Sequence, residues 1–267
     1  MLGAYRPGAR HQAVTRRLHL GRTRPISRKI QETSSNKKAL AIAETYHLVN
    51  SKLSLENENT KTVRLSDGTK AQIQIVGFKA DTFTDDGLPA GITLMFRTPI
   101  AMRAVNDGAA TGGWEQSSLR EWLADEGMAT LPDDLRNQIR SVRKLTNNTG
   151  GTKDASSITA TDDKLWLPSM SELCGYQAPE TFADGYGYLS DLYSGEGEQY
   201  QLYREQSVSS LTTNDAMIRT VAGKKICYWE RPPAPTAARA PTRRTLTALE
   251  KTATCLAGQR LETIRTK

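Results

Sequence analysis

The sequence contains little of the chemistry from which metal sites, disulfide frameworks and most catalytic centres are built. Its 267 residues include three cysteines, Cys174, Cys227 and Cys255, which form no Cys-x-x-Cys pair. The three histidines, His11, His19 and His47, all precede the well-patterned part of the chain. Zinc sites, disulfide staples and Ser-His or Cys-His nucleophiles are therefore unsupported. No metal and no cofactor are expected.

Long apolar runs are also missing. No stretch of about 18 apolar residues occurs, so no membrane span is expected. The first residues, MLGAYRPGARHQAVTRRLHLG, lack the apolar region of a secretory signal. The sequence itself gives no cellular location beyond these two expectations.

The charge is unevenly distributed. Residues 1–38 hold ten Lys or Arg and one Glu, and residues 231–267 hold eight Lys or Arg and two Glu. Because the whole chain carries +7, residues 39–230 carry a net charge of −8. The patterned middle is acidic and the basic residues lie in unpatterned ends, so we do not expect nucleic acid as a partner.

Alternating and helical patterns predict an α+β domain with long loops. Val63 and Leu65 alternate with polar residues before Asp67-Gly68, and the alternation resumes afterwards, which indicates a β-hairpin. A further strand is expected within GITLMFRTPIAM, and a helical lead-in within 39–60. Residues 1–38 lack a sustained period, and we expect them to be disordered.

Two helices are expected after the turn at Gly112-Gly113. Ser118 and Glu121 have the spacing of a capping box, and Gly127 suits a C-cap. The second helix is expected within LPDDLRNQIRSV, after Pro132.

The second half of the patterned region alternates loops with short elements. Residues 145–163 read as an exposed polar loop. KLWLPSMSELCG then predicts a strand through Leu165 and Leu167, followed by a helix capped by Ser169 and Glu172. GYGYLSDLYSGEGEQYQLYREQ is rich in Tyr and Gly, which suits either a loop covering the core or a binding face. One more strand is expected through Ile226, Tyr228 and Trp229.

An ordered set of short motifs resembles an uncharacterised domain family of gut bacterial surface proteins and phage or prophage tail-associated proteins. The motifs run from about Lys61 to Pro233 and include VGF, AGITLMF, GGWEQSSLREWL, DKLWLPSMSEL, GEGEQYQLY and YWERPP. The resemblance implies a compact C-type-lectin-like fold over 61–233. The motif residues with structural roles are Gly112, Gly113, Trp114, Arg120, Trp122, Trp166, Pro168 and Glu172.

The resemblance also implies a recognition function for an unknown glycan or protein ligand. Trp229 and Arg231 begin the stretch that forms the binding face in that group, and Tyr200 and Tyr203 lie in the Tyr-rich segment. Trp, Tyr and Arg dominate the energetics of interfaces. A core position for Trp229 is equally compatible with the sequence.

Two other functions stay open. The domain could decorate a phage tail or baseplate among other tail proteins without recognising a receptor. The resemblance also includes a formylglycine-generating enzyme branch with paired active-site cysteines, a pattern that Cys174 and Cys227 do not reproduce. We therefore expect no catalysis.

The last residues depart from the resembled family. Residues 231–267 contain eight Thr, seven Ala, six Arg and four Pro but no Phe, Tyr or Trp. Suitable synonymous codons, read in another frame, give the Tyr, Ser, Asn and Gly-rich sequence that the family carries there. We therefore expect a frameshift near Trp229 to Pro235, and a disordered tail over 234–267.

Overall fold

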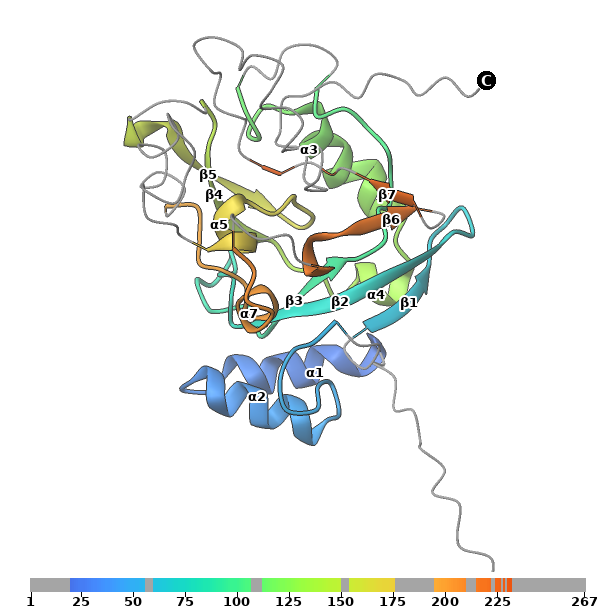
Figure 1. The fold of residues 1–267 in the computed structure, drawn as a ribbon, viewed down its shortest axis with the longest axis vertical. Helices are drawn as coiled ribbons and strands as arrows, with labels where there is room; N and C mark the ends of the chain where they lie inside the picture. The colour runs from blue at the N-terminus through green and yellow to red at the C-terminus, as the bar shows by residue number, and fades with distance from the viewer. Residues whose placement is uncertain are drawn as a thin grey trace, which may run out of the picture.

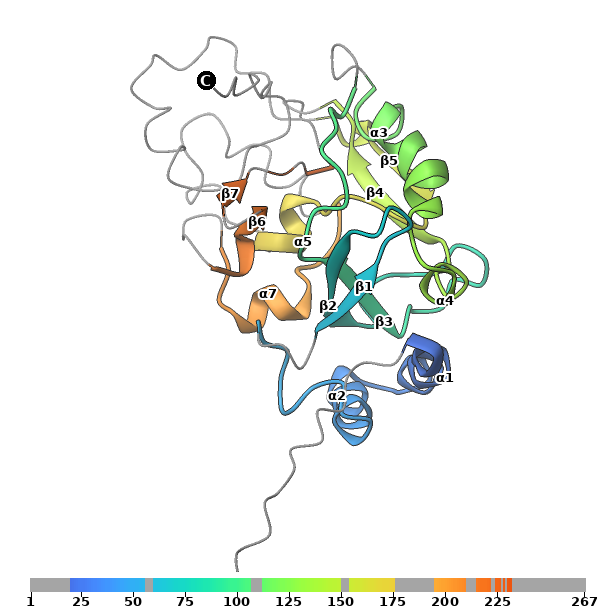
Figure 2. The ribbon, with the colours of Figure 1, turned by 90° about the vertical axis from the view of Figure 1, so that its right-hand side faces the viewer.

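The computed structural model describes residues 20–55, 60–106, 112–149, 154–175, 195–209, 215–221, 224–226, 228, 230 and 231. These residues form a mixed α+β structure, as expected. A pair of helices lies below a three-stranded sheet, and most of the other elements lie above it (Figures 1 and 2). None of the helices in this part of the chain is long and apolar enough to cross a membrane.

The central sheet has the antiparallel order β1-β2-β3, with β1 over Thr60–Arg64, β2 over Lys70–Phe78 and β3 over Ile92–Phe96. Val63 pairs with Ala71 across the turn at Asp67-Gly68, so the expected hairpin is confirmed. The strand expected in GITLMFRTPIAM is β3, which pairs with β2 and shifts register between Ile75 and Gly77. Most of β2 is buried, whereas β3 lies at the edge and is mostly half-buried.

Helices α1 (Leu20–Gln31) and α2 (Asn36–Thr45) pack against each other beneath the sheet. The prediction of disorder over residues 1–38 is therefore wrong from Leu20 onward, and residues 1–19 lie outside the described residues. Ile26 and Ile30, one helical turn apart, are buried in the core with Ala39 and Ala43. This packing stabilises a basic helix whose sequence lacks a long apolar stripe.

The contact of α1 with the sheet is very close. A Cβ atom added to Gly91, directly before β3, would lie 1.9 Å from the carbonyl oxygen of Ser27. Only glycine permits this approach. The expected helical lead-in over 39–60 starts earlier and is shorter than predicted, because α2 is capped by Ser35 and ends at Thr45. Leu48, Val49 and Leu53 are buried without being helical.

The two helices expected after Gly113 form with different bounds. Helix α3 (Ser118–Trp122) is capped by Ser117, whose side chain accepts a hydrogen bond from Arg120 N, so the expected cap at Ser118 is wrong by one residue. The chain continues through a π-helical turn, η2 (Leu123–Gly127), and Gly127 does not end the helix. Helix α4 covers only Asp133–Arg136.

The expected polar loop at 145–163 is instead part of a β-hairpin. Strand β4 (Val142–Asn147) pairs with β5 (Ile158–Asp163) in a regular antiparallel register. The inward side chains of β4 include the polar residues Lys144 and Thr146. Because these two residues are polar, the sequence of β4 does not show the alternation of apolar and polar residues that indicates a strand. The strand expected at Leu165 and Leu167 does not form, and these described residues lie in an irregular segment between β5 and α5.

The remaining elements cover the upper side of the molecule. Helix α5 (Met170–Cys174) has the predicted capping box of Ser169 and Glu172. Helix α7 (Gln201–Glu205) packs against β2. Short 3-10 turns occur at η3 (Ala155–Ser157) and η6 (Asp215–Met217). The strand expected through Ile226, Tyr228 and Trp229 extends only to Ile226, because β7 (Lys224–Ile226) pairs with β6 (Arg219–Val221) in a small hairpin. Tyr228 is not part of a strand, and Trp229 lies outside the described residues.

Candidate functional site

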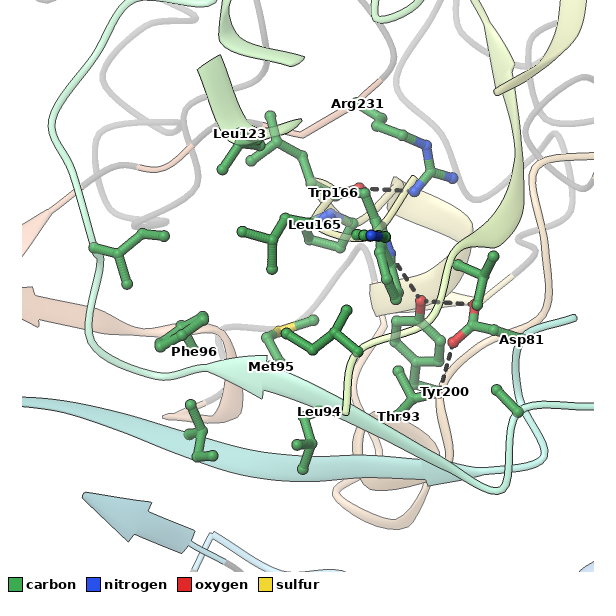
Figure 3. Close-up of a pocket in the computed structure, with 18 of the residues that line it drawn as sticks. Asp81, Thr93, Leu94, Met95, Phe96, Leu123, Leu165, Trp166, Tyr200 and Arg231 are labelled. Atoms are coloured by element: carbon green, nitrogen blue, oxygen red, sulfur yellow. Dashed lines mark hydrogen bonds between the residues drawn. The ribbon is translucent and has the colours of Figure 1, made fainter. Parts of the chain in front are cut away.

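A large cavity lies between the edge strand β3 and the segment that follows β5. Its volume is about 1690 Å³. Apolar side chains on β3 lie across the cavity from apolar side chains of α3, η2 and residues 165–167 (Figure 3). Leu94, Phe96, Leu123, Leu165 and Trp166 are among its lining residues. Since pockets for small molecules occupy about 300–1,000 Å³, this cavity can hold part of a larger ligand.

Strand β3 is only half-buried because its side chains Leu94 and Phe96 border this cavity. Ile73 and Ile75 on the neighbouring strand are 1 % and 0 % exposed, whereas Leu94 and Phe96 are only partly buried. Burying apolar area yields about 25 cal/mol per Å², so an uncovered apolar wall favours a ligand or partner that covers it.

Polar groups at the inner end of the cavity are bonded to one another. Tyr200 Oη receives hydrogen bonds from Lys144 Nζ at 3.2 Å and from Trp166 Nε1 at 3.3 Å, and donates to Asp81 Oδ1 at 3.3 Å. Thr93 Oγ1 donates to Asp81 Oδ2 at 2.6 Å. Figure 3 shows the bonds of Tyr200, before α7, with Trp166 and Asp81, and the bond of Thr93 on β3 with Asp81.

Behind this cluster lies a buried network of charges. Lys144 Nζ lies 2.5 Å from Asp81 Oδ1 and also contacts Glu172 Oε1. Arg231 Nη1 donates to Glu172 Oε2 at 2.9 Å and to the Leu167 carbonyl at 2.7 Å. Arg231 Nε donates to Thr146 Oγ1 at 2.8 Å. The network connects β4, α5 and the end of the described chain.

The charges in this network keep Glu172 ionised. Burial alone raises the pKa of a carboxyl, but the positive charges and hydrogen bonds of Arg231 and Lys144 outweigh it and hold the pKa of Glu172 below its usual value. Burial raises the pKa of Tyr200, with further contributions from the negative charges of Glu172 and Asp81. The phenol therefore stays protonated and can donate its hydrogen bond.

In contrast to Glu172, the neighbouring carboxyl of Glu196 has a raised pKa. Glu196 Oε1 accepts a hydrogen bond from Asn147 N at 2.7 Å, and within the described residues Glu196 Oε2 has no partner. Burial raises the pKa of Glu196 to about 8. Burial also raises the pKa of the Cys174 thiol to about 12, which keeps it protonated and a poor nucleophile.

The residues predicted to bind ligand are mostly in the interior. Tyr200 and Arg231 line the cavity, but both are 2 % exposed and their polar atoms are engaged in the network. Tyr203 is 1 % exposed, and its hydroxyl receives a hydrogen bond from Arg219 Nη2 at 2.8 Å. Trp229 lies outside the described residues. The residue types of an interface here serve mainly to build the core.

The motif residues around α3 form the turn before this helix and the hydrogen bonds that hold it. Gly112 and Gly113 turn the chain with φ angles of 81° and 58°. Trp114 is fully buried, and its Nε1 donates to Asp163 Oδ2 at 3.0 Å. Arg120 Nε pairs with the other oxygen of Asp163 at 2.7 Å.

The other motif residues lie at or beside the cavity. Trp122 is a half-buried lining residue, and its Nε1 donates to Glu126 Oε2 at 2.7 Å. Trp166 and Pro168 also line the cavity, and the Pro168 carbonyl accepts a hydrogen bond from Arg231 N at 2.9 Å. Glu172 both caps α5 and pairs with Arg231.

Three residues that matter here were not recognised from the sequence. Asp81 and Glu196 stand in irregular segments, where no period marks them as buried. Lys144 was detectable in principle, because Val142, Lys144 and Thr146 share the inward face of β4.

One comparison with known proteins finds a relationship. Residues 90–251 match the family described as Domain of unknown function (DUF6273), whereas no curated protein and no solved structure matches the chain. The match begins just before β3, later than the expected Lys61, and ends beyond the expected Pro233. It spans more than half of the chain and includes most residues that line the cavity. The chain therefore belongs to the DUF6273 family.

Proposed function

We propose that this chain is a non-enzymatic recognition domain of the phage or bacterial-surface type, and that it binds part of a protein or glycan ligand in the cavity above β3. The observation that carries the proposal is the size and apolar lining of this cavity beside an edge strand. The half-buried rings of Trp122 and Trp166 add aromatic surface that can pack on an apolar chain or a sugar ring.

The state of the inner polar groups favours binding over catalysis. Asp81, Lys144 and Tyr200 are hydrogen-bonded to one another, and Arg231 is saturated by Glu172, Thr146 and carbonyl oxygens. A general acid or base needs a proton-transfer atom within reach of a substrate. Groups held in this manner instead make the inner wall rigid, which suits a preformed binding site.

The proposal has two finer parts. We propose a C-type-lectin-like arrangement, in agreement with small sheets joined by long connections. We also propose a frameshift near Trp229 to Pro235. The family match past Pro233 counts against the frameshift, and the nucleotide sequence from codon 225 onward decides it. An alternate frame interrupted by stop codons would rule it out.

The binding proposal is tested by titration with 1-hexanol, a small neutral probe with an apolar chain. We expect the indole NMR signals of Trp122 and Trp166, which line the cavity, to shift. The signal of Trp114, which is fully buried in a cluster with Leu119 and Leu123 and does not line the cavity, should shift less. Saturable shifts that are largest for the two cavity tryptophans are the expected result.

A pair of variants locates the site. Leu165→Lys places a charge in the cavity and should abolish the shifts, because burying an unpaired ammonium is costly. Leu145→Lys is the matched control, because Leu145 is 40 % exposed on β4 and does not line the cavity. Unchanged binding by a folded Leu165→Lys variant would contradict the proposal.

A further inference from the structure

The lining of the cavity contains more positive than negative charge. Eight of its side chains are lysine or arginine, whereas four are aspartate or glutamate. Two of the four acidic side chains, Asp81 and Glu230, are buried. Asp81 is paired with Lys144, and burial raises the pKa of Glu230 to about 7, so a ligand meets little negative charge from either at a pH of about 6.

The other two acidic side chains are exposed and paired with arginines of the same lining. Glu32 Oε1 lies 3.3 Å from Arg28 Nε, and Asp86 Oδ2 lies 2.8 Å from Arg140 Nη2. The remaining exposed charges of the lining are all positive. They belong to Arg24, Arg103, Lys164 and Lys225.

Three of these cations lie beside apolar residues of the lining, and we call them the mouth cations. They are Arg103, Lys164 and Lys225. Their neighbours in the chain, Met102, Leu165 and Ile226, line the cavity as well. Since the mouth cations are exposed and their neighbours are apolar, a ligand that enters here meets positive charge and apolar surface side by side.

The two tryptophans of the cavity favour a protein segment over a sugar. Arg103 Cζ lies 4.9 Å from the centre of the Trp122 ring, and Lys144 Nζ lies 5.0 Å from the centre of a Trp166 ring. A cation therefore already uses one face of each ring, and fewer ring faces are left for a sugar to stack on. Apolar side chains do not depend on ring faces, because they can pack on the aliphatic wall, which includes Leu94 and Leu165.

We propose that the ligand is an acidic segment of a protein, whose apolar side chains enter the cavity and whose carboxylates lie at the mouth cations. Burial of the apolar side chains supplies the affinity, and the opposite charges fix the orientation and exclude basic segments. This inference rests on the proposed binding function and names the partner that the same site selects.

The test uses three blocked peptides of the sequence X-Leu-Phe-Leu-X, in which X is Glu, Gln or Lys. Calorimetric titration is carried out at a pH of about 6, where the peptide Glu is ionised and Glu230 is largely uncharged. At low salt we expect the Glu peptide to bind about fivefold more tightly than the Gln peptide, because exposed ion pairs contribute modestly, and the Lys peptide to bind most weakly. In about 1 M salt the preference should disappear, because exposed charges are then screened within about 3 Å.

Two triple variants assign the preference to the mouth cations. The first carries Arg103→Gln, Lys164→Gln and Lys225→Gln, and it should bind the Glu and Gln peptides equally. The matched control carries Lys37→Gln, Lys52→Gln and Lys70→Gln, all at exposed residues outside the cavity. It loses the same charge and should keep the fivefold preference. If the first variant does not fold, the ranking of the peptides on the unaltered chain and its dependence on salt still decide.

Each other outcome counts against the inference in a distinguishable manner. Equal binding of the three peptides, or shifts with 1-hexanol without binding of any peptide, would overturn the inference but leave the apolar binding function intact. Tightest binding of the Lys peptide would overturn the preference for acidic partners. Loss of the preference in the control variant would assign it to the net charge of the chain.

A fourth probe separates an acidic protein segment from an acidic glycan. Trigalacturonate carries carboxylates but no apolar side chains, so it should bind more weakly than the Glu peptide. Tighter binding of trigalacturonate would replace the protein partner by an acidic glycan. No binding of any peptide, of trigalacturonate or of 1-hexanol would contradict both proposals.

Discussion

Among single residues, Glu172 is the one whose loss should be most damaging. It pairs with both Arg231 and Lys144, and its side chain is 1 % exposed. Removing one member of a buried ion cluster costs about 3–5 kcal/mol, because the partners stay buried and unpaired. Glu172→Gln should therefore lower the free energy of unfolding by roughly that amount, measured by urea denaturation. Glu121→Gln, at an exposed residue, should change it by less than about 0.5 kcal/mol.

A second residue-level prediction concerns pH. The pKa of Glu196 is about 8 in the folded protein against an ordinary value of 4.5. A carboxyl with a raised pKa stabilises the fold fully below pH 4.5 and loses this contribution as the pH rises through about 8. The stability of the unaltered protein, relative to Glu196→Gln, should fall across this window by a few kcal/mol, since one pKa unit corresponds to about 1.4 kcal/mol. A constant difference between the two proteins would contradict the assignment.

A residue's role can be predicted from the sequence only where the residues next to it form a recognisable local pattern. The Ser169–Glu172 capping box is a local pattern, so its position was predictable, but its ion pair with Arg231 joins residues 59 apart. Arg231 and Tyr200 were selected because their types are common at interfaces. The structure places the same types in the interior, because their polar atoms find partners there.

Among the elements, the turn before α3 is the most sharply constrained. Gly113 has a φ of 58°, and a Cβ atom there would lie 2.5 Å from the Cα of Asn148 on the β4–β5 hairpin. Gly113→Ala therefore adds a backbone clash to the conformational strain. Gly87→Ala is a matched control, with a φ of 68° and nothing within 4 Å of the added atom.

We expect the control to lose about 1 kcal/mol and Gly113→Ala clearly more, since strain and overpacking each contribute roughly 1–3 kcal/mol. Thermal unfolding followed by circular dichroism measures both variants. Equal losses would show that the turn does not contact the hairpin closely.

The helices and strands that were predicted have local sequence signals, whereas those that were missed depend on contacts between residues distant in sequence. The β1–β2 hairpin and α5 were predicted because Asp67-Gly68 and Ser169–Glu172 are local signals. The β4–β5 hairpin was missed because its inward face includes Lys144 and Thr146, which are buried by partners distant in sequence. Helix α1 was missed because its burial depends on α2 and on the close approach of Gly91.

For the chain as a whole, the folded unit is larger than the region that the family match covers. The match begins at residue 90, so it contains β3 but neither β1 nor β2. Yet β2 is hydrogen-bonded to β3 and contributes Ile75, Val76 and Phe78 to the main core. The same core contains residues of α1, α2, α5 and α7, on both sides of the match boundary. The cavity is thus built on a strand that needs its neighbour.

A fragment of residues 90–251 should therefore fail to fold, although it covers the whole matched region. Without β2 the strand β3 loses its hydrogen-bonded partner, and apolar residues such as Leu173 and Tyr203 lose the core that buries them. We expect circular dichroism to show no cooperative thermal transition for this fragment, whereas a fragment of residues 20–251 should unfold cooperatively. If the shorter fragment unfolded cooperatively and still bound 1-hexanol, the first 89 residues would be an accessory to the domain, and the cavity wall would need no support from β2.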